Sequence, residues 1–175
     1  MLILVVGPSG AGKDTLLAGA RRALAADERF HFARRVITRP ADAGAEDHEP
    51  ATEAEFLRRA FALQWQAHGL RYGIPIDVIA MLHRRRIVIA SISRSIIAAA
   101  AARFPVRVIE VIAPPELLAH RLAARGREDG AGIASRLVRQ VDLPAGIRIE
   151  TVVNDGTIEE GTQRFLTALC RVLRA

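Results

Sequence analysis

The chain of 175 residues is poor in cysteine and in large aromatic residues, with one Cys, one Trp and one Tyr. The lone cysteine, Cys170, excludes a disulfide within the chain. The single Trp and Tyr leave few rings for base stacking, although the formal net charge of +6 would suit a nucleic-acid binder. The arginines are also spread along the chain instead of forming one basic stretch. We therefore expect no nucleic-acid partner.

Long apolar runs are also absent, and none approaches the roughly 20 residues that cross a bilayer. The apolar start, residues 1–6, leads into a glycine loop, without the basic start or the small-residue cleavage site of a signal peptide. A composition of 50% hydrophobic and 25% charged residues is typical of globular proteins. We expect a single domain over residues 1–175, located in the cytoplasm, with no membrane contact.

Lysine is the scarcest charged residue, because Lys13 is the only lysine among 25 basic residues. It ends the pattern Gly7-x4-Gly12-Lys13, which follows the apolar run and opens a helical pattern. In such a loop, backbone N–H groups surround phosphate oxygens, and the helix start adds partial positive charge. A compact ammonium fits between two phosphates where a broad guanidinium does not. The pattern predicts an ATP site made by Gly7, Pro8, Ser9, Gly10, Ala11, Gly12, Lys13, Asp14 and Thr15.

The metal contact of this loop is unusual. Asp14 occupies the position where a Ser or Thr normally faces Mg²⁺, and Thr15 comes one residue later. Either Thr15 takes this role or Asp14 contributes a carboxylate, and the sequence leaves both open. No acidic residue ends the apolar run 87–92, where a metal-positioning Asp is common. We predict Mg²⁺ as the cofactor, with Asp14 and Thr15 as its candidate ligands.

The rest of the chain alternates apolar runs with helical patterns, which predicts an α/β fold of the P-loop NTPase type, a parallel sheet flanked by helices. The predicted strands are residues 2–6, 87–92, 106–112 and 151–153. The predicted helices are residues 15–26, 94–103, 115–125 and 157–173.

Two segments depart from this alternation. Residues 38–50 are predicted to be a loop and residues 61–75 short strands and turns, separated by a helix that starts with a Thr52–Glu55 capping box. We interpret residues from about 37 to 80 as a small substrate-binding insertion. The glycine-rich stretch 126–132 joins two helical patterns and predicts a lid over about residues 121–136.

Short motifs spread over nearly the whole chain resemble the guanylate kinase family. They are Gly-Pro-Ser-Gly-Ala-Gly-Lys at 7–13, Ile-Thr-Arg at 37–39, Glu-Phe at 55–56, Trp65, His-Gly at 68–69, Tyr-Gly at 72–73, the arginine-rich stretch 121–128, Arg-Leu at 136–137 and Asn-Asp at 154–155. The resemblance implies that Arg39 and Tyr72 bind an acceptor phosphate. However, Asp42 stands where guanylate kinases have a second arginine, and Gln64 where they have a guanine-reading glutamate.

The departures, together with Ser93 and Arg94, make the chain more similar to the ribose 1,5-bisphosphate phosphokinases of bacterial phosphonate breakdown. This resemblance implies phosphoryl transfer from ATP to a small phosphorylated sugar, yielding 5-phosphoribosyl 1-diphosphate (PRPP). The roles that it implies are catalysis by Lys13, Arg125 and Arg136 and acceptor binding by Arg39, Tyr72, Ser93 and Arg94. A guanylate kinase, or a non-catalytic guanylate-kinase-like binding module, is the alternative.

Some of these residues also have purely structural interpretations. Tyr72 and Trp65 could be packing residues, and His68 is better explained by structure than by catalysis. The segment Asn154-Asp155-Gly156 could approach adenine or could form a turn that caps the following helix.

Overall fold

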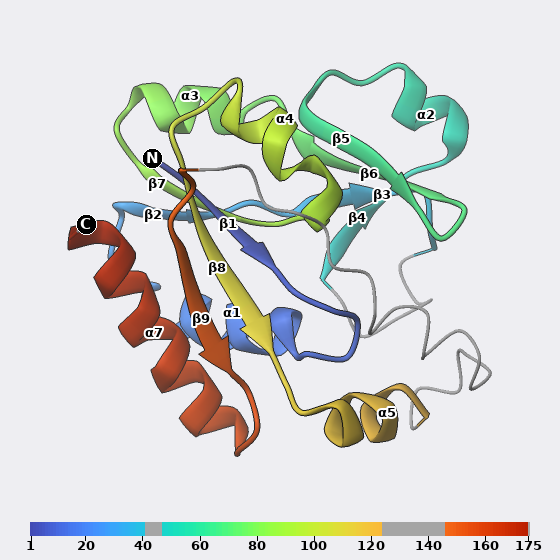
Figure 1. The fold of residues 1–175 in the computed structure, drawn as a ribbon. Helices are drawn as coiled ribbons and strands as arrows, with labels where there is room; N and C mark the ends of the chain where they lie inside the picture. Colours follow the sequence, from blue (N-terminus) through green and yellow to red (C-terminus); the bar gives the residue numbers. More distant parts are fainter. Residues whose placement is uncertain (41–46, 124–145, 175) are drawn as a thin grey trace.

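A computed structural model describes residues 1–40, 47–123 and 146–174 (Figure 1). Its main sheet has five parallel strands, as the alternating pattern predicts. In spatial order they are β2 (Phe30–Phe32), β7 (Ile87–Ser91), β1 (Leu2–Val6), β8 (Val106–Ile112) and β9 (Ile149–Val153). All five residues of the central strand β1 are buried, in agreement with its continuous apolar sequence.

Helices cover both faces of this sheet. On one face, α1 (Lys13–Ala23) and α7 (Ile158–Arg174) pack Leu16, Phe165 and Leu169 against alternate residues of the strands. On the other face lie α3 (Val78–His83), α4 (Ile97–Ala101) and part of the second sheet. The side chains of the parallel strands point alternately to these two layers, so both faces of the sheet are apolar.

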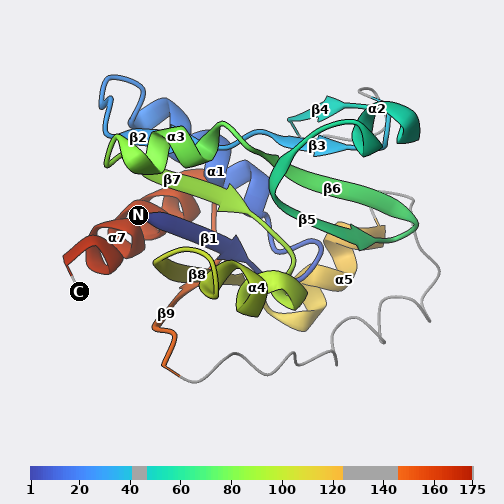
Figure 2. The same ribbon diagram turned by 90° about the horizontal axis from the view of Figure 1, so that it is seen from above.

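The second sheet has four strands and flanks the carboxyl end of β1, as does α5 (Pro115–Ala123) (Figure 2). Its strands, in spatial order, are β4 (His48–Pro50), β3 (Arg35–Ile37), β6 (Leu70–Pro75) and β5 (Phe61–Ala67). The turn between β5 and β6 is formed by His68 and Gly69, with φ angles of 53° and 71°. Positive φ at both central residues is the geometry of a tight hairpin turn, which supports a structural role for His68.

The helix predicted from the capping box is confirmed as α2 (Glu53–Leu57). The hydroxyl of Thr52 accepts from the backbone N–H of Glu55, and the Glu55 carboxylate accepts from the backbone N–H of Thr52. Both bonds satisfy N–H groups that a helix start otherwise leaves without partners.

Several elements differ from the prediction. Helix α1 begins at Lys13 and ends at Ala23, two to three residues earlier at each end than predicted. The predicted helix 94–103 is divided into a 3₁₀ turn, η1 (Arg94–Ile96), followed by α4. Part of the predicted loop 38–50 pairs with β3 as β4. The strands β2 and β3 and the helix α3 were not predicted.

The predicted lid lies mostly outside the described residues, which reach residue 123 at the end of α5. Among the described helices, none is both long and apolar enough to span a membrane.

Candidate nucleotide-binding site

The loop Gly7–Gly12 connects the end of β1 to the first residue of α1. Three of its glycines have positive φ, with 145° at Gly7, 85° at Gly10 and 88° at Gly12. At Gly7 a Cβ atom would lie 2.1 Å from the carbonyl oxygen of Val111 in β8. The backbone path thus requires glycine at these positions. The loop leads into the N-terminus of α1, where anions bind favourably.

The side chain of Lys13 folds back over this loop. Its Nζ donates hydrogen bonds of 2.9 Å to the carbonyl oxygens of Gly7 and of Pro8. The ammonium is thereby held beside the loop, where the prediction places the triphosphate.

Two side chains from distant segments fix the loop from the outside. Asn154, which follows β9 and is 5% exposed, donates from Nδ2 to the carbonyl oxygen of Ala11 at 2.7 Å. Arg121 of α5 donates from Nη1 to the carbonyl oxygen of Asn154 at 3.2 Å, and at 3.5 Å to that of Gly10. Both residues therefore support the shape of the loop, a role that the sequence did not reveal.

The turn after Asn154 starts α7. The hydroxyl of Thr157 accepts from the backbone N–H of Glu160, whose carboxylate accepts in return from the backbone N–H of Thr157. The cap of α7 is therefore formed by Thr157 and Glu160, directly after residues 154–156, and an approach of these three residues to adenine stays a prediction.

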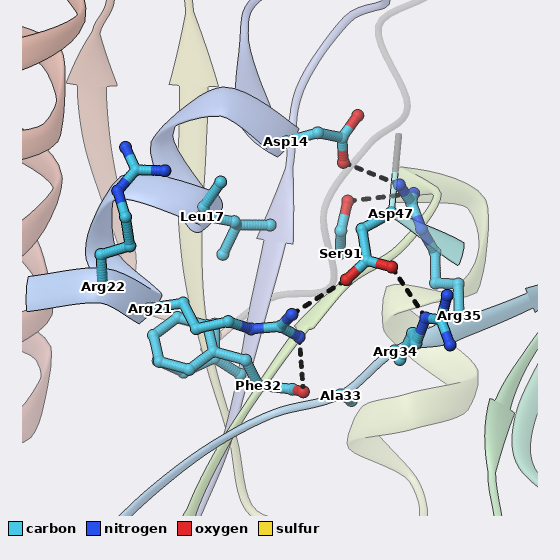
Figure 3. Close-up of a pocket in the computed structure, with 12 residues that line it drawn as sticks. Asp14, Leu17, Arg21, Arg22, Phe32, Ala33, Arg34, Arg35, Asp47 and Ser91 are labelled. Atoms are coloured by element: carbon cyan, nitrogen blue, oxygen red, sulfur yellow. Dashed lines mark hydrogen bonds and ion pairs between the residues drawn. The ribbon is translucent and has the colours of Figure 1, made fainter. Parts of the chain in front are cut away.

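Asp14, a predicted metal ligand, is bound to an arginine of the second sheet. Its Oδ1 lies 2.7 Å from Nη2 of Arg35, and Nη1 of Arg35 donates to the hydroxyl of Ser91 at 3.1 Å (Figure 3). Thr15, the other candidate, is exposed on α1. Both offer the oxygen atoms that Mg²⁺ prefers, and Asp14 also supplies the charge.

A cavity of about 220 Å³ lies beside α1 and is lined by Asp14 and Leu17 (Figure 3) and by Ile89 of β7. At its rim, Asp47 accepts from Arg21 at 2.9 Å and from Arg34 at 2.8 Å. Burial alone would raise the pKa of Asp47, but the hydrogen bonds from the two arginines outweigh it and lower that pKa.

The predicted acceptor residues Ser93 and Arg94 lie beside the start of the phosphate loop. The backbone N–H of Ile92 donates to the carbonyl oxygen of Val5, so the chain leaves β7 at the carboxyl end of β1. Here Nη2 of Arg94 lies 2.5 Å from Oε1 of Glu110, a residue of β8 for which the sequence predicts no role. The hydroxyl of Ser93 caps η1.

The other two predicted acceptor residues belong to the second sheet. Arg39 follows β3, and its Nε and one terminal nitrogen are buried. The ring of Tyr72 is buried and stacks on Trp65, with centroids 5.3 Å apart and planes 10° apart. This geometry agrees with a packing role for both aromatic residues, and phosphate binding by Tyr72 stays a prediction.

The remaining predicted catalytic residues, Arg125 and Arg136, lie outside the described residues. Within residues 1–40, 47–123 and 146–174, no group of three or more His, Cys, Asp or Glu side chains could hold a metal ion.

Comparison with known proteins identifies the family. Residues 2–141 match the family model described as an AAA domain. The ribose 1,5-bisphosphate phosphokinase of Acidiphilium cryptum (strain JF-5) is 52% identical over 171 residues, which are 97% of this chain and 92% of that protein. The chain belongs to the ribose 1,5-bisphosphate phosphokinase family.

Other members of this family differ in length. The ribose 1,5-bisphosphate phosphokinase of Brucella melitensis biotype 2 is 46% identical over 94% of this chain and 88% of its own length. A bifunctional ribose 1,5-bisphosphokinase-thymidine phosphorylase of Cupriavidus necator is 51% identical, but this chain corresponds to only 28% of it.

Solved structures of other kinases have a similar fold to this chain. Guanylate kinase from Anaplasma phagocytophilum superimposes with a TM-score of 0.64 at 20% identity, covering 98% of this chain and 85% of that one. A gluconokinase from Sinorhizobium meliloti 1021 superimposes with a TM-score of 0.52 at 18% identity, covering 97% of this chain and 91% of that one. The fold and the family resemblance inferred from the sequence are therefore confirmed.

Proposed function

We propose that this chain transfers the γ-phosphoryl group of ATP to the 1-phosphate of ribose 1,5-bisphosphate, giving ADP and PRPP. The observation that carries this proposal is the 52% identity, over nearly the full length of both chains, to a relative with that activity in its name. The glycine loop with its lysine supports it, because this loop supplies the donor half of the site.

The chemistry requires alignment and charge neutralisation rather than proton abstraction. The nucleophile is an oxygen of a phosphate that is already ionised at neutral pH, so no general base is needed. Lys13 would neutralise charge on the β and γ phosphates, and Arg39 and Arg94 would orient the acceptor. The Arg94–Glu110 pair beside β1 places a cation next to the loop without adding net charge.

Mg²⁺ bound to ATP would neutralise further charge on the phosphates, and the oxygen atoms of Asp14 and Thr15 fit it chemically. Arg125 and Arg136 would close over the transferring group from the lid and exclude water. We place the reaction in the cytoplasm, and we propose that residues 1–175 act as one catalytic unit.

Gln64 disfavours the alternative function, phosphorylation of GMP. It is an exposed, neutral amide on β5 at the position where guanylate kinases have a guanine-reading carboxylate. A neutral amide cannot accept the pair of hydrogen bonds that a carboxylate accepts from guanine.

The test is a substrate comparison with products identified by mass. The purified chain, with Mg²⁺ and ATP, is offered ribose 1,5-bisphosphate or GMP at equal concentrations, with Lys13→Ala as the control for contaminating kinases. We expect PRPP formation with kcat/KM at least about 100-fold above that for GMP. Efficient GDP formation, or PRPP formation that persists in the Lys13→Ala preparation, would contradict the proposal.

A further inference from the structure

Arg35 joins three elements at the edge of the nucleotide site. It extends from β3, which belongs to the second sheet, and it contacts Asp14 in the first turn of α1 and Ser91 at the end of β7 (Figure 3). The side chain of Arg35 is 11% exposed, whereas that of Asp14 is 39% exposed. A guanidinium this deeply buried needs a compensating negative charge nearby.

The position of Asp14 creates an electrostatic conflict. The carboxylate replaces the neutral hydroxyl that other P-loops place directly after the lysine, and it therefore brings a negative charge to the helix start that must bind a polyphosphate. The negative charges of a carboxylate and of a phosphate bound beside it repel each other strongly in a site that is partly shielded from water. A neighbouring side-chain cation that compensates the carboxylate would reduce this repulsion before the magnesium–nucleotide complex binds.

The neighbouring cations have other contacts. Lys13 donates to the carbonyl oxygens of Gly7 and of Pro8, and Arg21 and Arg34 both bind Asp47. Arg35 is the arginine of this cavity whose guanidinium lies 2.7 Å from the Asp14 carboxylate.

We propose that Arg35 is a positioning residue of the ATP site, which compensates and orients the Asp14 carboxylate so that this unusual phosphate loop can accept the magnesium–nucleotide complex. The bond to Ser91 fixes the guanidinium, which in turn holds Oδ1 of Asp14. This inference rests on the ATP-binding half of the proposed function and is independent of the identity of the acceptor.

The proposal predicts that the effects of changing Asp14 and Arg35 are strongly coupled. Arg35→Gln leaves the carboxylate uncompensated, so Mg·ADP should bind at least about tenfold more weakly. The double variant Asp14→Ser/Arg35→Gln has a neutral loop of the common type, and its affinity should return to within about threefold of the original chain. Arg35→Lys keeps the positive charge but lacks the two terminal nitrogens that contact Asp14 and Ser91, so it should give an intermediate affinity for Mg·ADP.

The experiment is a calorimetric titration of each variant with Mg·ADP, without acceptor. Thermal unfolding of the same samples separates lost binding from lost folding. Arg29→Gln is the matched control, because Arg29 is an exposed arginine paired with Asp27, and its loss removes the same charge without touching the site. We expect the control to bind like the original chain.

The outcomes separate the two proposals. If the double variant binds as weakly as Arg35→Gln, or if Arg35→Gln folds and binds normally, the role of Arg35 is refuted. If Arg35→Gln does not fold, the Mg·ADP affinities of Arg35→Lys and of Asp14→Ser/Arg35→Gln are compared instead. Equally weak binding by these two variants refutes the role of Arg35. Absence of Mg·ADP binding by the original chain would instead refute the proposed function.

Discussion

The side-chain amide of Asn154 donates a hydrogen bond of 2.7 Å to the carbonyl oxygen of Ala11 and so ties the end of β9 to the phosphate loop. Because Asn154 is buried and lies against Gly12, where a Cβ atom would come within 2.3 Å of its Nδ2, this contact also explains why position 12 is glycine.

Replacing Asn154 by Ala should destabilise both the fold and the nucleotide site. The carbonyl of Ala11 would lose its partner in a buried environment, which costs about 1–3 kcal/mol. We expect chemical denaturation to show this loss and a titration to show weaker ADP binding. The exposed Asp155→Asn should leave stability nearly unchanged, because exposed ion pairs contribute little. Equal stability of Asn154→Ala and the original chain would show that the hydrogen bond from Asn154 to Ala11 does not stabilise the fold.

Loss of the Lys13 ammonium should reduce turnover with little effect on folding. For Lys13→Ala we expect kcat to fall by ~100-fold or more, because the residue neutralises charge that develops on the transferring group. Lys13→Arg should be similarly impaired, since the guanidinium is too broad for the loop. ADP production measures the rate, and circular dichroism checks the fold. Normal turnover in either variant would contradict the role assigned to this lysine.

The close contact of α1 with α7 predicts that Gly19→Ala is destabilising, although alanine normally favours a helix. A Cβ atom at Gly19 would lie 2.4 Å from Oγ1 and 2.8 Å from Cγ2 of Thr162, so rotation of this threonine cannot relieve both contacts. We expect a loss of about 1–3 kcal/mol in urea unfolding. A Thr162→Ala background removes both atoms and leaves only the Cβ of residue 162, at 3.2 Å, so most of the loss should disappear there. An undiminished loss would exclude this clash as the cause.

Asp47 should make stability depend on pH in the acid range. Its pKa is lowered in the folded chain from the ordinary value of 3.8, so its ion pairs stabilise the fold above that value. This contribution disappears as the pH falls through the lower, folded-state pKa. Since the pairs are about half exposed, we expect less than about 1 kcal/mol.

Urea unfolding of the original chain and of Asp47→Asn should therefore differ at pH 7 and converge toward pH 3. A difference that grows on acidification would have the wrong sign for this explanation.

The strands and the phosphate loop could be predicted because local sequence determines them. The run 2–6 is continuously apolar and the run 106–112 is apolar except for Arg107 and Glu110, and the observed strands have the same bounds. The capping box at Thr52 was equally local. By contrast, β2 and β3 have three residues each, and β3 begins with an arginine, so neither has a recognisable period.

The partners of the site residues could not be predicted, because they depend on contacts between distant segments. Arg35 reaches Asp14 across 21 positions and Ser91 across 56, and nothing in the sequence around it indicates either contact. Likewise, Glu110 lies within a mostly apolar strand, and only the order of the strands in the sheet places it next to Arg94.

The bond between Asn154 and Ala11 spans 143 positions of the chain, and this has a consequence for synthesis on the ribosome. At about 5–20 residues per second, the phosphate loop is made roughly 7–30 s before its anchor. A nascent chain interrupted before residue 154 therefore carries the loop sequence without the contact that fixes the loop, and this contact forms only once β9 has joined the sheet.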